Sequence, residues 1–173
     1  MILAEDEAKL YLQASTMAVW APRGQPFSVR VDPSRKSTSF YGTLNLTTGQ
    51  EVVTQAEKMN AVATAQHLQA LLDAYPTGKI LLLWDKAPWH RGQAIREVVE
   101  RNPRLTLHLF PTASPDLNPQ EHVWRATRRE VAHNHTQRRL PDIAARFEHH
   151  LRQTTFPSSF LDHYTYPVCP GFI

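Results

Sequence analysis

A short apolar segment near the middle of the chain, residues 79–84 (KILLLW), constrains the fold more than any other part of the sequence. Its apolar residues do not alternate with polar ones, which is typical of a strand buried on both faces of a parallel sheet. Helical patterns flank the segment, because one apolar stripe at helical spacing begins after Asn60 and another after Pro88. This alternation predicts an α/β fold whose later strands are parallel and covered by helices.

The first third of the chain follows another pattern. Short β-rich runs, such as 27–31 and 38–46, alternate with turn signals across residues 11–55 and predict an antiparallel β-meander. The apolar residues 1–4 predict a strand before the meander, and the alternating residues 105–109 predict one after the central helices. We therefore expect a mixed sheet, antiparallel early and parallel later, with helices on both faces.

The composition fits one folded domain. Of the 173 residues, 42% are hydrophobic and 20% are charged, which is ordinary for a globular protein with a core of its own. A last helical pattern begins at Leu140 and predicts a domain that spans residues 1–155, followed by an extended tail at 156–173. No apolar run is long enough for a membrane span, and the single cysteine, Cys169, suits a reducing cytosol.

The segment 114–124 (SPDLNPQEHVW) combines a rigid turn with the start of a helix. Each proline fixes its own φ and pushes the preceding residue toward extended geometry. Asn118 is a suitable N-cap, Pro119 a suitable first helical residue, and Glu121 then occupies the third helical position. Taken alone, Glu121 fits a capping box with Asn118. A carboxylate held at the mouth of a helix directly after a strand also fits a metal ligand.

Three acids lie where this topology can bring them together. Asp6 ends the first predicted strand, Asp85 ends the buried strand, and Glu121 opens the helix after the last strand. Ligand sites of open α/β sheets lie beyond the carboxyl ends of the strands. Crowded carboxylates repel one another, and divalent cations relieve that repulsion. Oxygen ligands favour Mg²⁺ or Mn²⁺ over zinc, and two such ions about 4 Å apart support phosphodiester displacement.

Three segments resemble the signature blocks of the DDE transposases: residues 4–7 (AEDE), 81–90 (LLLWDKAPWH) and 110–124 (FPTASPDLNPQEHVW). The sequence is most similar to the bacterial insertion-sequence branch of the mariner-type superfamily, in which the spacing of 35 residues between Asp85 and Glu121 is usual. Residues 20–24 (WAPRG) also resemble the early hairpin of that family. The similarity covers nearly the whole chain, and its most specific part is the block that ends in Glu121.

The resemblance implies an RNase H-like fold and a metal-dependent endonuclease that cuts transposon ends and joins the free 3′-hydroxyl to target DNA. By position, Asp6, Asp85 and Glu121 would be the catalytic metal ligands. The family usually carries helix-turn-helix DNA-binding domains before the first acid, and none fits in the five residues before Asp6. A separate subunit or a missing domain would then recognise DNA. The resemblance further implies a homo-oligomer on DNA and a location in the cytoplasm at the nucleoid.

Several basic side chains are candidates for DNA contact. Lysine and arginine supply most of the non-specific affinity for DNA, and the net charge of +3 permits such a partner. Lys86 stands where the family commonly has asparagine, so it can contact a phosphate or compete with a metal. His90 can orient Asp85 or approach DNA. The predicted DNA contacts are Arg125, Arg128, Arg129, Lys86 and His90.

Two other functions fit the same residues. One is an RNase H-like nuclease that acts without strand transfer. The other is an inactive or domesticated copy that serves as a DNA-binding module, an interpretation that Lys86 and the lack of an N-terminal DNA-binding domain support. A zinc hydrolase built on the histidines is remote, because His133, His135, His149 and His150 lack the usual zinc-ligand spacing.

Overall fold

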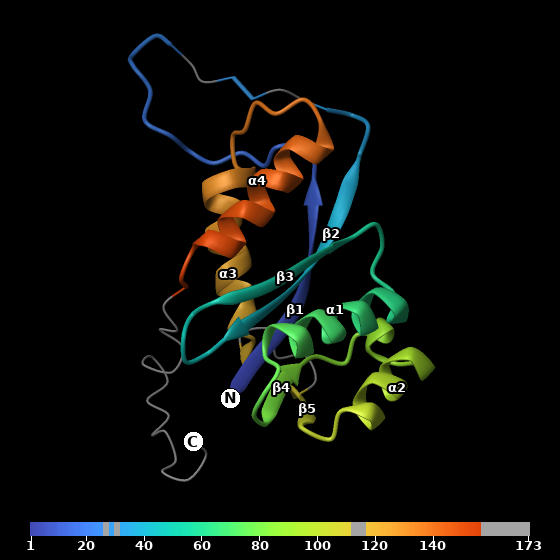
Figure 1. Ribbon diagram of the computed structural model, residues 1–173. Helices are drawn as coiled ribbons and strands as arrows, with labels where there is room; N and C mark the ends of the chain where they lie inside the picture. The colour runs from blue at the N-terminus through green and yellow to red at the C-terminus, as the bar shows by residue number, and fades with distance from the viewer. Residues whose placement is uncertain (26–27, 30–31, 112–116, 157–173) are drawn as a thin grey trace.

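A computed structural model describes residues 1–25, 28–29, 32–111 and 117–156 of the chain. Its centre is a five-stranded sheet in the order β3-β2-β1-β4-β5 (Figure 1). The pairs β1–β2 and β2–β3 are antiparallel, whereas β1–β4 and β4–β5 are parallel. The predicted mixed sheet is thus confirmed. The strands are β1 (Ile2–Tyr11), β2 (Ser37–Asn45), β3 (Glu51–Ala56), β4 (Ile80–Trp84) and β5 (Leu105–Leu109).

Helices cover both faces of this sheet, as predicted (Figure 1). On one face α3 and α4 pack around Phe40, Trp124 and Phe147. On the other face α1 and α2 pack against Leu3 and Leu82. No helix among the described residues is long and apolar enough to cross a membrane. The helical elements are α1 (Ala61–Ala74), η1 (Pro88–His90), α2 (Gln93–Arg101), α3 (Gln120–Thr127), η3 (Arg128–Ala132) and α4 (Leu140–Gln153).

Strand β1 is longer than its apolar start predicts. The sequence pattern ends the strand at Asp6, within the acidic residues, but the structure continues it to Tyr11. It persists because every residue from Leu3 to Tyr11 has a partner on β2. Successive side chains of a strand point to opposite faces of the sheet. The acids of β1 are therefore divided between the two helical layers.

Other details of the predicted elements also change. Strand β4 alternates in burial, with Leu81 and Leu83 only partly buried. The helix expected from Pro88 divides into η1 and α2, and Gly92, which has a φ of 141°, lies between them. The predicted strand at 27–31 and the tail after Phe156 lie largely outside the described residues, so the structure does not assess them.

His67 on α1 joins the helix to the sheet. Its Nε2 lies 2.8 Å from Thr43 Oγ1 on β2, and its Nδ1 lies 2.9 Å from Thr54 Oγ1 on β3. The side chain is fully buried. Burial lowers the pKa of His67 to about 3, and the nearby His90 acts in the same direction. The folded protein thus keeps this imidazole neutral under conditions in which an exposed histidine takes up a proton.

Replacing His67 with glutamine should make the protein less sensitive to acid. Between an unfolded-state pKa near 6.5 and a folded-state pKa of about 3, the unfolded chain binds the extra proton, so stability falls as the pH decreases. We expect the free energy of unfolding of the unmodified protein to fall more steeply below pH 6.5 than that of His67→Gln, by up to about 1.4 kcal/mol per pH unit. Urea unfolding at several pH values measures both slopes, and equal slopes would contradict a neutral His67.

Candidate metal centre

Asp6 lies on β1 and faces α3. Trp124 Nε1 of α3 donates a hydrogen bond to Asp6 Oδ2 at 3.1 Å. Burial, together with the negative charges of Glu121 and Glu7, raises the pKa of Asp6 to about 7, against the lowering effect of the Trp124 hydrogen bond. Asp6 and Glu121 are therefore close enough to repel each other. A cation between them would relieve this repulsion.

The start of α3 places Glu121 near β1. The Asn118 side chain accepts a hydrogen bond from the Gln120 amide at 3.1 Å and donates one to the Glu5 carbonyl at 3.1 Å. Asn118 thus ties the start of the helix to β1, but it is not the N-cap that the sequence predicts. The helix begins one residue later than expected, at Gln120, with Pro119 at the N-cap. Among the described residues, no hydrogen bond returns from the Glu121 side chain to the Asn118 amide. The capping box is therefore not closed, and the Glu121 carboxylate is not engaged as a cap.

Gly42 allows α3 to approach the sheet at this point. It lies opposite Asp6 in the β1–β2 register. A Cβ atom at position 42 would lie only 2.5 Å from Trp124 Cη2 and closer still to Gln120 Nε2. Any larger residue would push the start of α3 away from β1. The separation of Asp6 and Glu121 therefore depends on the absence of a side chain at position 42.

Asp85 follows β4 directly, as predicted. Ile2 of β1 lies opposite Leu81 of β4, and the same register continued along the strands places Asp6 beside Asp85. Asp85 Oδ1 accepts a hydrogen bond from the Ala87 amide at 2.8 Å and lies 3.0 Å from His90 Nδ1. The side chain is 51% exposed, so the carboxylate remains open to solvent.

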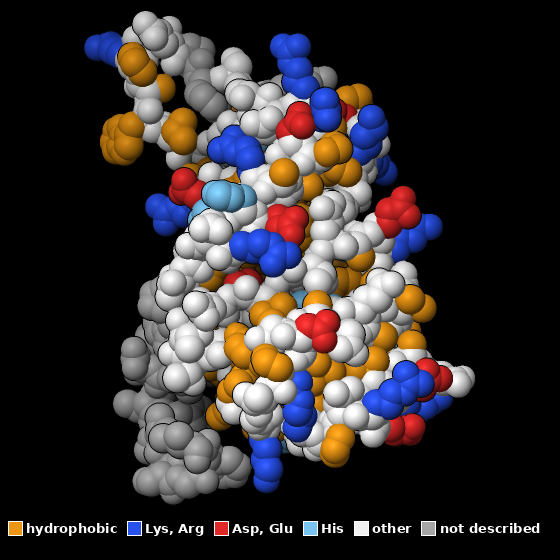
Figure 2. Space-filling model, viewed as in Figure 1, with side chains coloured by type: hydrophobic (Ala, Val, Ile, Leu, Met, Phe, Trp, Pro, Cys, Tyr) orange, Lys and Arg blue, Asp and Glu red, His pale blue; other side chains and the backbone are white. Residues whose placement is uncertain are grey.

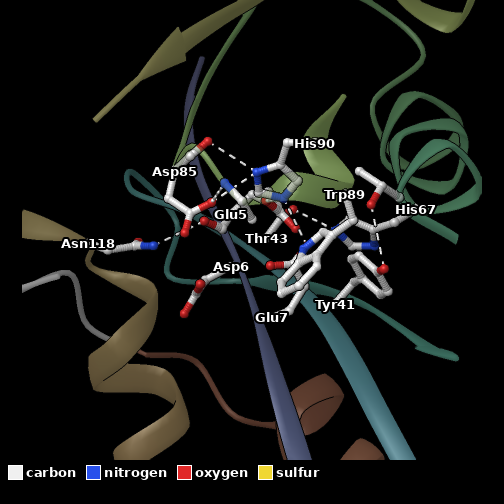
Figure 3. Close-up of polar contacts among 12 residues, drawn as sticks. Glu5, Asp6, Glu7, Tyr41, Thr43, His67, Asp85, Trp89, His90 and Asn118 are labelled. Carbon is white, nitrogen blue, oxygen red and sulfur yellow. Dashed lines mark hydrogen bonds and ion pairs between the residues drawn. The ribbon is translucent and has the colours of Figure 1, made fainter. Parts of the chain in front are cut away.

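A second acidic group lies on the opposite face of β1 (Figure 3). His90 Nε2 is 2.8 Å from Glu7 Oε1 and 3.4 Å from Glu5 Oε2. Trp89 Nε1 donates to the same Glu7 oxygen at 2.6 Å. Burial raises the pKa of Glu5 well above its ordinary value, and the charges of Glu7, Asp6 and Asp85 raise it further. Burial tends to lower the pKa of His90, but contact with Glu7 and Asp85 raises it overall.

The structure thus divides the acids differently from the sequence analysis. It places Asp6 near Glu121 on the α3 side of β1, while the contacts of Asp85 run to His90 and Ala87. Among the described residues, the three side chains whose ligand atoms lie within 4.8 Å of one another are Glu5, Glu7 and His90. Sequence reasoning missed Glu5 and Glu7 because it ended the strand at Asp6 and gave these two neighbours no part in a site. A strand continued through residues 5–7 would have assigned them to the face opposite Asp6.

The predicted DNA contacts fall into two groups. Arg125, Arg129 and Lys86 are exposed and Arg128 is partly buried. Figure 2 shows Lys and Arg side chains intermixed with Asp and Glu over the region of α3 and α4. His90, in contrast, is only 7% exposed, and both ring nitrogens contact carboxylates. Its burial does not favour contact with DNA.

The sequence matches the family described as DDE superfamily endonuclease over residues 2–144. This chain therefore belongs to the DDE superfamily endonucleases. It is also similar to the insertion element IS630 uncharacterized 39 kDa protein of Shigella sonnei, with 24% identity over 135 residues, which cover 78% of this chain and 39% of that protein.

Solved structures of the Mos1 mariner transposase share the fold. The catalytic domain superimposes with a TM-score of 0.61 at 15% identity, over 95% of this chain and 76% of that one. The paired-end complex with Mn gives a TM-score of 0.65 at 18% identity, over 95% of this chain and 52% of that one. The RNase H-like fold is confirmed. The chain spans about two fifths of the curated relative and about half of the Mos1 chain in that complex.

The residues present fit a divalent metal. The predicted ligands offer only carboxylate oxygens, which Mg²⁺ and Mn²⁺ prefer. Asp6 is partly buried and lies close enough to Glu121 for the two to repel, an arrangement that disfavours two ionised carboxylates unless a cation accompanies them. Asp85, at the end of the neighbouring parallel strand, keeps an exposed carboxylate. A site made of carboxylate oxygens is consistent with membership of the DDE superfamily endonucleases.

Gly42→Ala should weaken both the fold and the metal site. The added methyl group overlaps Trp124 and Gln120, so the start of α3 must move and take Glu121 away from Asp6. We expect the free energy of unfolding to fall by about 1–3 kcal/mol, as for other overpacked positions. Calorimetric titration should also show weaker Mn²⁺ binding.

Gly78→Ala is the matched control. Gly78 has a φ of 83°, so alanine there strains the backbone, but no atom lies within 4 Å of the added Cβ and the position precedes β4, at the end away from Asp85. This variant should lose stability without losing Mn²⁺ affinity. Unchanged Mn²⁺ binding in Gly42→Ala would show that the position of α3 does not affect the site.

Proposed function

We propose that this chain is the catalytic domain of a DDE transposase, with Asp6, Asp85 and Glu121 as ligands of two Mg²⁺ or Mn²⁺ ions. The observation that carries the proposal is the pairing of Asp6 with Glu121, two acids 115 positions apart, on the α3 side of the strand next to β4. Membership of the DDE superfamily endonucleases supports it. Solved complexes of Mos1, which shares this fold, include forms with Mn and with Mg.

The reaction follows from the arrangement of the acids. Asp6, Asp85 and Glu121 would hold the cations, which would supply activation of the attacking oxygen and stabilisation of the leaving oxygen of a phosphodiester. Asp6 and Glu121 hold their carboxylates on the α3 side, where Trp124 orients Asp6. Asp85 presents an exposed carboxylate from the neighbouring strand. Water would serve as the nucleophile for cleavage of a transposon end, and the freed 3′-hydroxyl would serve for joining to target DNA.

DNA would bind along the exposed basic side chains next to this site. Arg125, Arg128 and Arg129 follow Glu121 along α3 and η3, and Lys86 follows Asp85. Mos1 paired-end complexes with transposon ends show this fold on DNA. We infer that this chain acts as a homo-oligomer on DNA, at the nucleoid of a bacterial cytoplasm. Recognition of a specific end sequence would belong to a helix-turn-helix domain or subunit.

Metal-dependent cleavage tests the assignment of the three acids. The protein should nick a transposon-end duplex in Mn²⁺ or Mg²⁺, and Asp6→Asn, Asp85→Asn and Glu121→Gln should each reduce the rate by at least about 100-fold, the magnitude of losing one preorganised charge at the reacting centre. Gel analysis of end-labelled DNA measures the rate. Glu130→Gln is the matched control, because Glu130 is an exposed acid on η3.

The outcomes separate the alternative functions. Nicking without joining to a supercoiled target would favour an RNase H-like nuclease over a transposase. DNA binding without metal-dependent nicking would favour an inactive or domesticated module. Full activity in Asp85→Asn would reject Asp85 as a ligand.

Neutralising Arg125 and Arg128 should weaken DNA binding to a similar degree for every DNA sequence, because phosphate contacts do not read the bases. The slope of log Kobs against log salt concentration is negative, and each lost phosphate contact reduces its magnitude by about 0.9. We therefore expect the Arg125→Gln, Arg128→Gln double variant to show a shallower slope by up to about 1.8. Fluorescence anisotropy at several salt concentrations measures it.

Arg96→Gln with Arg101→Gln makes the same change of charge on α2, on the opposite face of the sheet. Its slope should match that of the unmodified protein. Equal slopes for all three proteins would remove α3 and η3 from the DNA-binding surface.

A further inference from the structure

We propose that Glu7 and His90 are positioning residues that hold the Asp85 carboxylate in place for metal binding. The inference rests on the proposed function in one respect, because it takes Asp85 to be a metal ligand. Glu7 and His90 lie on the side of β1 opposite Asp6. In this proposal they do not contact the metal but affect its binding through Asp85.

The two ring nitrogens of His90 connect two carboxylates. Nδ1 lies 3.0 Å from Asp85 Oδ1, and Nε2 lies 2.8 Å from Glu7 Oε1. The hydrogen-bond partner of Nε2 is this Glu7 oxygen, and both contacts of Nδ1 go to Asp85. The ring also lies 3.1 Å, at Nδ1, from the Asp85 carbonyl. His90 therefore fixes both the backbone and the side chain of Asp85 (Figure 3).

The histidine ring itself is held from several directions. It stacks on Trp84 with a centroid separation of 4.3 Å and an interplanar angle of 15°. Its acceptor, Glu7, receives a further hydrogen bond from Trp89 Nε1 at 2.6 Å. The side chains of both His90 and Glu7 are almost completely buried. A rotated ring would lose the Glu7 contact inside the protein, where an unsatisfied polar group is costly.

This chain of contacts also joins the two strands that carry the predicted ligands. Asp6 and Glu7 are consecutive on β1, so Asp6 faces α3 while Glu7 faces His90. Asp85 follows β4, and the pairing of β4 with β1 ends at Ala4 and Leu83. Beyond that last pair, the contacts from Glu7 through His90 to Asp85 connect the two segments. The position of Asp85 relative to Asp6 therefore depends on them.

The same side chains suggest one competing role. Glu5, Glu7 and His90 can together surround a cation, and both carboxylate oxygens of Glu5 are buried without a hydrogen-bond partner in the described structure. The separation of 2.8 Å between Nε2 and Glu7 Oε1, however, is that of a direct hydrogen bond. The proton of that hydrogen bond lies between the two atoms, where a metal bound to both would have to lie. The two roles predict different Mn²⁺ binding and can be separated.

The test measures Mn²⁺ binding to the full chain by calorimetry, with no DNA present. Glu7→Ala and His90→Ala should each weaken binding at the Asp85 site by about 10- to 100-fold, the usual effect of removing a partner of a metal ligand. His90→Asn, which keeps a donor near the position of Nδ1 but loses the contact of Nε2 with Glu7, should recover only part of the affinity. In an Asp85→Asn background, Glu7→Ala should have no further effect, because its influence passes through Asp85.

His67→Ala is the matched control. It also removes a buried histidine from the α1 side of the sheet, but its partners are Thr43 and Thr54. It should lower the unfolding temperature and leave Mn²⁺ affinity unchanged. Equal losses of affinity in His67→Ala and His90→Ala would overturn the proposal, because general destabilisation would then explain both.

The remaining outcomes are also decisive. If Glu7→Ala removes one bound Mn²⁺ per chain even in the Asp85→Asn background, the buried group is itself a metal site and the positioning role is wrong. If Asp85→Asn weakens binding but Glu7→Ala does not, the inference fails and the proposed function stands. If Asp85→Asn leaves Mn²⁺ binding unchanged, the assignment of Asp85 fails and the inference fails with it.

Discussion

Repulsion among carboxylates around β1 is the constraint on which the rest of this structure depends. Three consecutive acids, Glu5, Asp6 and Glu7, occupy one strand that helices cover on both sides. Strand geometry divides them, so that Asp6 faces Glu121 and the other two face His90. Each side then needs positive charge. On one side the buried His90 contacts both carboxylates, and on the other we infer divalent metal.

The packing of α3 serves this arrangement directly. Asn118 ties the start of the helix to β1, Trp124 fills the core while donating to Asp6, and Gly42 leaves the space that Trp124 requires. The same contacts that bury apolar surface thus determine where the Glu121 carboxylate lies. A site built this way is coupled to the stability of the fold, because α3 cannot shift without disturbing both.

Much of the architecture was predictable from sequence because its signals are local. Asn60 caps α1, Pro141 opens α4, and residues 105–109 form a strand, each as its own neighbours indicate. The prediction was weakest for β1, whose acidic residues do not look like part of a strand. They remain extended because β2 pairs with them, and that pairing is not visible in the local sequence.

The sequence by itself determined the order of strands and helices and the family, since the blocks around Asp6, Asp85 and Glu121 are contiguous motifs. Only the tertiary structure decided which acids share a side of the sheet. It also gave His90 its partners, because the contact with Glu7 joins residues 83 positions apart. Local preference cannot specify such a contact. The packing of η1 and β4 against β1 creates it.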